Sequence, residues 1–109
     1  MIRETYNERL AELQDDLLAM GRLVDQAVDL SIQALANHDT ALAQQIIDGD
    51  AQVNTALRDI EEKCLVLIAT QQPLASDLRT FLSVANVATE MERMGDYAKG
   101  IAQITLDIA

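Results

Sequence analysis

The residues best suited to bind a ligand lie in the segment EMERMGDYAKG, at positions 90–100. Glu92 and Asp96 are four residues apart, so on a helix their carboxylates lie on one face, about one turn apart. The two charges repel each other by roughly 0.2–0.5 kcal/mol. Gly95 costs about 1 kcal/mol relative to alanine in a helix interior. Converging carboxylates suit a hard cation such as Mg²⁺, Ca²⁺, Mn²⁺ or iron. The spacing alone is nevertheless more typical of a solvated acidic face, with Gly95 packed against a neighbouring helix.

Asp50 is a further acid of interest, because it lies among apolar residues spaced by three and four positions, between Ile46 and Val53. Asn54 follows Asp50 after four residues. A charged group in such a place is costly unless it is paired or bound to a metal. The alternative is a polar residue that fixes the register of the packed helices. Asp25 and Asp29 have the same spacing but lie beside an apolar stripe, so we expect them at the surface.

Other kinds of catalytic or cofactor site find little support. His38, the only histidine, falls in a predicted loop, which leaves no helical histidine for a Glu-x-x-His di-iron centre. Cys64 lies on an apolar stripe with no histidine near it in sequence, which predicts a buried thiol rather than a nucleophile. The chain contains neither a glycine-rich phosphate loop nor a Gly-x-Ser-x-Gly motif. We therefore predict that the protein is not an enzyme.

Composition indicates a helical protein without nucleic-acid or membrane ligands. The chain has 109 residues, of which 50% are hydrophobic and only 3% aromatic, as in a helix bundle. Its net charge of −10 argues against binding to nucleic acid or to an anionic membrane surface. No apolar run approaches the roughly 20 residues that would insert into a bilayer. The polar N-terminal segment and the single cysteine favour a cytoplasmic location.

Apolar periodicity divides the chain into three helices, at about residues 6–37, 40–71 and 73–108. Thr5 and Glu8 form a capping-box pattern that places the first start near Tyr6. Asp39 is the expected N-cap of the second helix, and Pro73 suits the first turn of the third. The stripes with spacings of three and four comprise Leu10, Leu13, Leu17, Met20, Val24 and Ala27; Ala43, Ile46, Asp50, Val53, Leu57, Ile60, Cys64 and Leu67; and Val84, Val87, Met91, Met94, Ala98, Ile101 and Ile108.

These elements predict an all-α fold. Helices joined by short connections pack as antiparallel neighbours. About 30 residues per helix correspond to a length of roughly 45 Å. The expected architecture is an antiparallel, up-down-up three-helix bundle that forms a single domain over residues 1–109.

The segments GDAQVNTALRDIEEKCLVLIATQQPLASDLR and EMERMGDYAKGIA resemble the PhoU family. In the second, Glu92, Arg93, Met94, Gly95 and Asp96 match a Glu-Arg-Ile/Met-Gly-Asp signature. The first segment matches at Asp50, Asn54, Ile60, Glu61, Cys64, Ile68, Ala69, Gln72, Pro73, Asp77, Leu78 and Arg79, and the first predicted helix matches more loosely at Met20, Gly21, Leu23 and Val24. The resemblance covers nearly the whole chain.

The resemblance implies one PhoU repeat and a possible metal site. In the family, Glu/Asp-x-x-x-Asp motifs on neighbouring helices bind multinuclear clusters of iron, zinc, magnesium or manganese. The corresponding metal candidates here are Asp50, Asn54, Glu92 and Asp96. Glu90, just before the signature, is a weaker candidate.

The resemblance also implies a regulatory role. PhoU proteins are non-catalytic adaptors that link the ATPase subunit of a phosphate ABC transporter to a phosphate sensor histidine kinase, and they repress the phosphate-starvation response. They usually contain two tandem repeats, whereas this chain matches the first, as in an N-terminal half or truncated product. If it exists alone, the exposed third helix favours a homodimer. The alternatives are a metal-binding helical bundle and an autonomous helical oligomerisation module.

Overall fold

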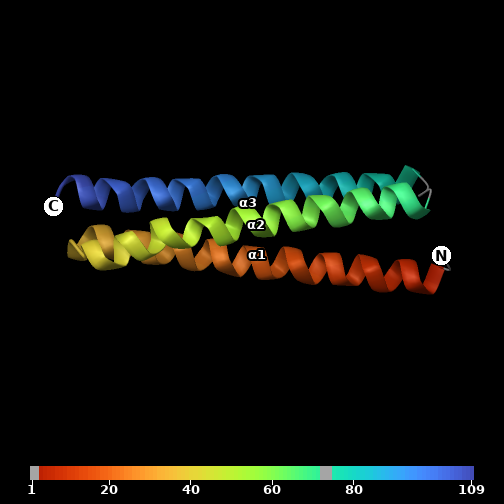
Figure 1. Cartoon of the computed structure of the whole chain (residues 1–109), viewed down its shortest axis with the longest axis horizontal. Coiled ribbons are helices and arrows are strands. Elements are labelled where there is room, and N and C mark those ends of the chain that lie inside the picture. The colour runs from red at the N-terminus through yellow and green to blue at the C-terminus, as the bar shows by residue number, and fades with distance from the viewer. Residues whose placement is uncertain (1–2, 72–74) are drawn as a thin grey trace.

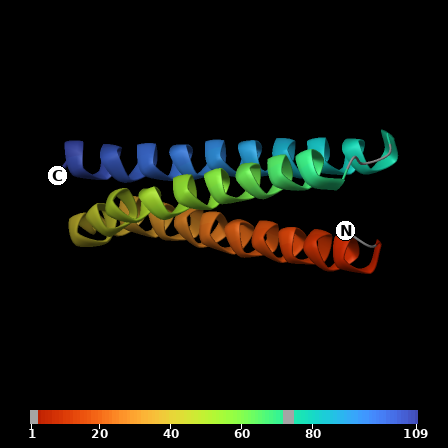
Figure 2. The same ribbon diagram turned by 45° about the vertical axis from the view of Figure 1, so that its right-hand side comes forward.

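The computed structural model of the chain describes residues 3–71 and 75–109 and contains three helices, α1 (Arg3–Asn37), α2 (Thr40–Gln71) and α3 (Ala75–Asp107). The helices lie side by side along the long axis of the molecule, as Figures 1 and 2 show. α1 and α3 run in one direction and α2 runs in the other. The bundle measures 56 × 18 × 16 Å. The predicted all-α, antiparallel up-down-up three-helix bundle is therefore confirmed.

The start of α1 differs from the sequence prediction. α1 begins at Arg3 rather than near Tyr6, so Thr5 lies inside the helix and cannot cap it. Contacts with α3 hold this first turn: Arg3 pairs with Asp77 at 3.2 Å, and Tyr6 packs edge-on against Phe81. At the other end of the chain, α3 ends at Asp107, as predicted to within one residue. The predicted start of the third helix at Pro73 lies outside the described residues.

The turn between α1 and α2 confirms the predicted N-cap. The backbone N–H of Leu42 donates a hydrogen bond of 3.0 Å to Oδ1 of Asp39. His38, just before it, has a φ of 53°, a left-handed conformation that ends α1. The backbone N–H of Asp39 donates to the carbonyl oxygen of Ala34 at 2.9 Å. These bonds satisfy backbone groups that the two helix ends would otherwise leave without partners.

The core divides into two apolar clusters along the bundle. The larger one fills the half that contains the C-terminal end of α2 and the N-terminal end of α3, and it includes Leu13, Met20, Ile60 and Phe81. The smaller one, near the α1–α2 turn, consists of Ala34, Ala43, Ile46 and Ala102. Asp50 lies on α2 between Ile46 of the small cluster and Val53 of the large one. A charged residue thus separates the two halves of the core.

The apolar stripe predicted for the third helix is only partly correct. Val84 and Ala98 are buried, but Val87, Met94 and Ile108 are 44%, 49% and 57% exposed. The residues that face the other helices are Phe81, Val84, Ala88, Gly95, Ala98, Ala102 and Thr105. α3 therefore turns mostly small side chains inward and several large apolar side chains outward. Among the described residues, none of the helices has an apolar stretch long enough to cross a bilayer.

Candidate metal-binding site

Asp50 of α2 lies beside Gly95 of α3. Its side chain is 7% exposed. A Cβ atom added to Gly95 would lie 3.6 Å from Oδ1 of Asp50 and 3.3 Å from Cγ1 of Val53. A Cβ here would be in ordinary contact with the Asp50 carboxylate but tight against Val53, so the glycine mainly leaves room for Val53 beside the backbone of α3. The sequence prediction that Gly95 packs against a neighbouring helix is correct.

Lys99 is a residue of this site that the sequence reasoning missed. Its Nζ atom lies 3.8 Å from Oδ2 of Asp50, and its side chain is 48% exposed. Lys99 follows Gly95 by one helical turn, which places both residues on the same side of α3. That spacing was the available signal, since a buried acid is expected to face a cation. The ammonium group offsets part of the cost of burying the Asp50 carboxylate.

The structure brings Glu92 and Asp96 next to Asp50. Glu92 is half-buried and Asp96 is exposed. Burial raises the pKa of the Glu92 carboxyl, and the charge of Asp96, a hydrogen bond with Asp96 and the charge of Asp50 raise it further. The pKa of Asp50 is also raised, mainly by burial and to a lesser extent by Asp96, while Lys99 acts in the opposite direction. These mutual effects show that the three carboxylates share one electrostatic environment.

The remaining candidates lie at the margin of this group or outside it. Asn54 is half-buried one turn after Asp50, but in the part of the chain that the structure describes it forms no hydrogen bond with the three acids. Glu90 pairs with Arg93 at 2.8 Å on the exposed surface of α3. Asp25 and Asp29 are exposed on α1, as the sequence analysis expected. The acidic site therefore consists of Asp50, Glu92 and Asp96, with Lys99 beside them.

The donor set fits a cation only in part. Carboxylate oxygens are suitable ligands for Mg²⁺, Mn²⁺ or iron. Within residues 3–71 and 75–109, however, no three His, Cys, Asp or Glu side chains are arranged to hold a metal ion together. Lys99 also occupies one side of Asp50. The arrangement is an open acidic site, in which a cation would require water or other ligands in addition.

A groove between α1 and α2 leads to Asp50. Its volume is about 210 Å³, and Gly49 and Gly95 line it together with Asp50. Three glutamine side chains line it, together with apolar residues of both helices: Gln26, Gln45, Gln52, Leu23, Ala27, Leu30, Leu42, Ile46 and Val53. The buried acid therefore borders a groove whose lining is mainly apolar, with three glutamines as its neutral polar side chains.

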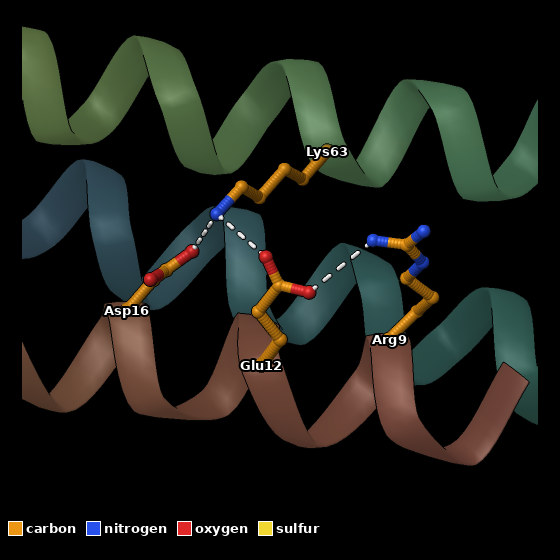
Figure 3. A network of polar contacts seen from close by, with 4 residues as sticks. All are labelled: Arg9, Glu12, Asp16 and Lys63. Carbon is orange, nitrogen blue, oxygen red and sulfur yellow. Dashed lines mark hydrogen bonds and ion pairs between the residues drawn. The ribbon is translucent and has the colours of Figure 1, made fainter. Parts of the chain in front are cut away.

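A second groove of about 490 Å³ lies between the other ends of α1 and α2. Here Lys63 of α2 bridges Glu12 and Asp16 of α1, and Glu12 also pairs with Arg9 (Figure 3). The side chains of Lys63 and Glu12 are 42% and 48% exposed. Exposed ion pairs of this kind contribute at most about 1 kcal/mol each. The network therefore links α1 to α2 but adds little to the stability of the bundle.

Cys64 is a buried thiol, as predicted. Its side chain is 5% exposed within the larger core cluster. Burial raises the pKa of this thiol, and the charge of Glu61 raises it further. Since the thiolate is the reactive form, these surroundings disfavour a nucleophilic role.

Comparison with known proteins identifies the family of the chain. The PhoU domain matches residues 17–105. A phosphate-specific transport system accessory protein PhoU homolog from Pseudomonas putida is 39% identical over 107 residues, which are 98% of this chain and 42% of the relative. The phosphate-specific transport system accessory protein PhoU from Escherichia coli K12 is 36% identical over 102 residues, or 94% of this chain and 42% of the relative. The chain thus spans less than half the length of these relatives.

Solved structures agree with this match. The crystal structure of PhoU from Pseudomonas aeruginosa superimposes with a TM-score of 0.91 at 38% identity, over 94% of this chain and 49% of the other. A phosphate transport system regulatory protein PhoU from Streptococcus pneumoniae gives a TM-score of 0.87 at 36% identity, over 93% and 48%. The resemblance noted in the sequence is confirmed, and the chain belongs to the PhoU domain family.

Proposed function

We propose that this chain is a regulator of phosphate uptake and of phosphate-starvation signalling. In this role it is a non-catalytic adaptor in the cytoplasm, placed between the ATPase subunit of a phosphate ABC transporter and a phosphate sensor histidine kinase. The observation that carries the proposal is the match to relatives named as phosphate-specific transport system accessory proteins. The relatives carry this name as full-length proteins, and the present chain spans less than half of their length. Assigning the adaptor role to this chain is therefore part of the proposal.

The form of the molecule supports an adaptor role. A rod 56 Å long presents extended helical faces on which two partners can bind at separate places. The only cysteine is buried and the only histidine is exposed at the α1–α2 turn, so neither lies in the acidic site. An accessory protein of this kind acts through its surfaces rather than through a reaction.

Binding measurements with purified partners test this proposal. The chain would be immobilised and exposed to the phosphate transporter ATPase subunit, and separately to the cytoplasmic region of the sensor kinase, both from the same organism. An ATPase subunit from an unrelated ABC transporter is the matched control. Saturable binding to the two phosphate-system proteins and none to the control is expected. Absence of binding to both would refute the adaptor role for this chain.

The acidic site favours a second candidate function, which is metal binding. We propose that Asp50, Glu92 and Asp96, with Asn54 at the margin, bind a divalent or ferric cation such as iron, zinc, magnesium or manganese. The support is the raised pKa of both Asp50 and Glu92, which neighbouring acids increase. A bound cation removes this repulsion and competes with the ammonium of Lys99 for Asp50. If several ions bind at this site, they would form the multinuclear cluster that the family resemblance implies.

Elemental analysis and melting curves with and without a chelator test for the metal. Metal present at 100 times its Kd stabilises a folded protein by about 2.7 kcal/mol, which is a shift of several degrees in Tm. The Asp50→Asn/Asp96→Asn variant should lose both the metal and the shift. Asp25→Asn/Asp29→Asn removes two acids with four-residue spacing from α1 and should lose neither. Metal-free protein with identical melts would exclude the cation.

The alternative function, an autonomous helical oligomerisation module, predicts that Glu92 and Asp96 are dispensable. If the chain served only to hold helices together, Glu92→Ala plus Asp96→Ala would leave both partner binding and association unchanged. Loss of either activity in this double variant therefore argues against that alternative.

A further inference from the structure

The groove between α1 and α2 contains a single charge in an otherwise neutral lining. Asp50 is the only ionisable residue among the described residues that line it, and it is 7% exposed. The more exposed lining residues are glutamines, namely Gln26, Gln45 and Gln52. The less exposed ones are mostly apolar: Leu23, Ala27, Leu30, Leu42, Ile46 and Val53. The groove therefore offers a buried carboxylate beside apolar walls, with amide groups nearer the solvent.

The Asp50 carboxylate can accept a partner besides Lys99. A carboxylate has about four positions at which it accepts hydrogen bonds. Among the described residues, none donates a hydrogen bond to Asp50, and its ion pair with Lys99 spans 3.8 Å, beyond hydrogen-bond distance. Lys99 is not one of the described residues that line the groove, so no cation meets the carboxylate from that side. A buried carboxylate with unused acceptor positions favours a ligand that donates hydrogen bonds.

The lining of the groove discriminates among kinds of ligand. An anion would be repelled by Asp50 and by the net charge of −10. A neutral apolar group would cover the carboxylate without compensating its charge. A metal ion needs several oxygen ligands, whereas Glu92 and Asp96 are not among the described residues that line this groove. The lining therefore favours a positively charged group on an apolar stem.

An arginine side chain matches the groove in hydrogen bonding and in size. Its aliphatic stem packs on apolar surfaces while the charged head reaches a polar partner. Its guanidinium has five N–H donors and no acceptor, which suits a carboxylate together with the carbonyl oxygens of glutamine side chains. It is also less strongly hydrated than the ammonium of lysine, so it enters a partly buried site at lower cost. The volume of about 210 Å³ lies below the roughly 300–1,000 Å³ of small-molecule pockets and suits one side chain.

We propose that this groove is a docking site for an arginine side chain of a partner protein. The guanidinium pairs with the Asp50 carboxylate, and the stem lies against apolar residues of α1 and α2. Charge complementarity supports this occupant, because an acidic chain attracts basic segments and Asp50 is the one charge that they meet in the described lining of the groove. The inference holds whether or not the partner belongs to a phosphate system, so it can be tested separately from the adaptor role.

Titration of the purified chain with a short peptide, followed by NMR, tests the proposal. The probe is the peptide Ala-Leu-Arg-Leu-Ala with blocked ends. The matched control peptide carries citrulline, the neutral isostere of arginine, in place of the arginine. A chelator is present so that no metal competes for Asp50. We expect saturable binding of the arginine peptide with a Kd of about 1 mM or tighter, and binding of the citrulline peptide that is at least about tenfold weaker.

Two pairs of variants locate the binding. Asp50→Asn keeps the shape of the side chain and should weaken binding of the arginine peptide at least about tenfold. Asp48→Asn makes the same change in net charge at an exposed position and should leave the Kd within about twofold. Gly49→Leu should also weaken binding by filling the groove, and a Cβ at this residue meets nothing within 4 Å. Gly100→Leu, at an equally open position outside the groove, is its control.

Four results would overturn the proposal. The first is the absence of saturable binding of the arginine peptide. The second is equal affinity for the arginine and citrulline peptides, or for the wild type and Asp50→Asn, because no ion pair would then form in the groove. The third is a loss in Asp48→Asn as large as that in Asp50→Asn, which would indicate attraction by the overall charge. The fourth is binding of free spermidine, dependent on Asp50 and tighter than that of the peptide, which would assign the groove to a small organic cation.

Discussion

Asp50 of α2 and Lys99 of α3 form an ion pair in which the acid is buried and the lysine is largely exposed. Oδ2 of Asp50 lies 3.8 Å from Nζ of Lys99, and the acid is 7% exposed while the lysine side chain is 48% exposed. A separation of 3.8 Å is longer than a hydrogen bond. The pair therefore compensates only part of the cost of burying the carboxylate, and the pKa of Asp50 remains raised.

We expect Asp50→Asn to stabilise the protein at neutral pH by on the order of 1 kcal/mol, because replacing a buried charge is often favourable. The sign follows from the pKa. A carboxyl whose pKa is higher in the folded state binds protons more tightly there, so unfolding becomes easier as the pH rises from the ordinary value of 3.8 through the raised one. The gain should appear above this window and vanish below it. Urea unfolding between pH 3.5 and 7 measures it.

Lys99→Gln provides the contrasting variant. It removes the cation and leaves Asp50 buried without its partner, so the free energy of unfolding at pH 7 should fall. The same loss should shrink at acidic pH, where Asp50 is protonated. Stabilisation by both variants, or destabilisation by both with no dependence on pH, would show that the Asp50 charge does not control stability here.

The close approach at Gly95 predicts a steric effect. In Gly95→Val, the Cβ lies 3.3 Å from Cγ1 of Val53 before its two methyl groups are added. Val53 is buried and β-branched, so it has little freedom to move aside. We expect a loss of about 1–3 kcal/mol in the free energy of unfolding, as is typical of overpacked cores. Chemical denaturation of the purified variant is the measurement.

Gly100 is the matched control on the same helix. A Cβ at this position would meet nothing within 4 Å. Gly100→Ala should therefore raise the free energy of unfolding by up to about 1 kcal/mol through helix propensity alone. If Gly95→Val were as stable as Gly100→Ala, the two helices would not be closely packed at Gly95.

The sequence was sufficient for the three helices, but not for the face that α3 turns inward. Because Val84 and Val87, or Met91 and Met94, are three residues apart, the apolar pattern contains two overlapping stripes. Periodicity alone favours the stripe with the larger residues, whereas the structure buries the smaller ones, Ala88 and Gly95 among them. Small side chains let α3 pack closer to α1 and α2, so side-chain size decides which face of α3 is buried. That effect depends on residues of other helices, which are far apart in the sequence.

Two details of the site and of α1 were out of reach for the same reason. Whether Asp50 meets Glu92 depends on how far α2 and α3 are shifted along each other, and no local pattern fixes that shift. Lys99 faces Asp50 only because of this register. The start of α1 likewise depends on contacts of its first turn with Asp77 and Phe81, more than 70 residues away.

The N-cap of α2, by contrast, is a local feature that the sequence predicted correctly and that mutation can test. Asp39→Ala removes the oxygen that accepts the hydrogen bond of 3.0 Å from Leu42, and we expect a loss of about 1 kcal/mol in the free energy of unfolding. Asp39→Asn retains a side-chain oxygen at the same place and should cost only a few tenths of that amount. Thermal and urea unfolding of the three proteins make the comparison.

Because the aspartate also places a negative charge at the positive end of the helix dipole, part of its effect should weaken in high salt, whereas the hydrogen bond persists. Equal losses for alanine and asparagine would mean that this charge, rather than the capping hydrogen bond, determines where α2 begins.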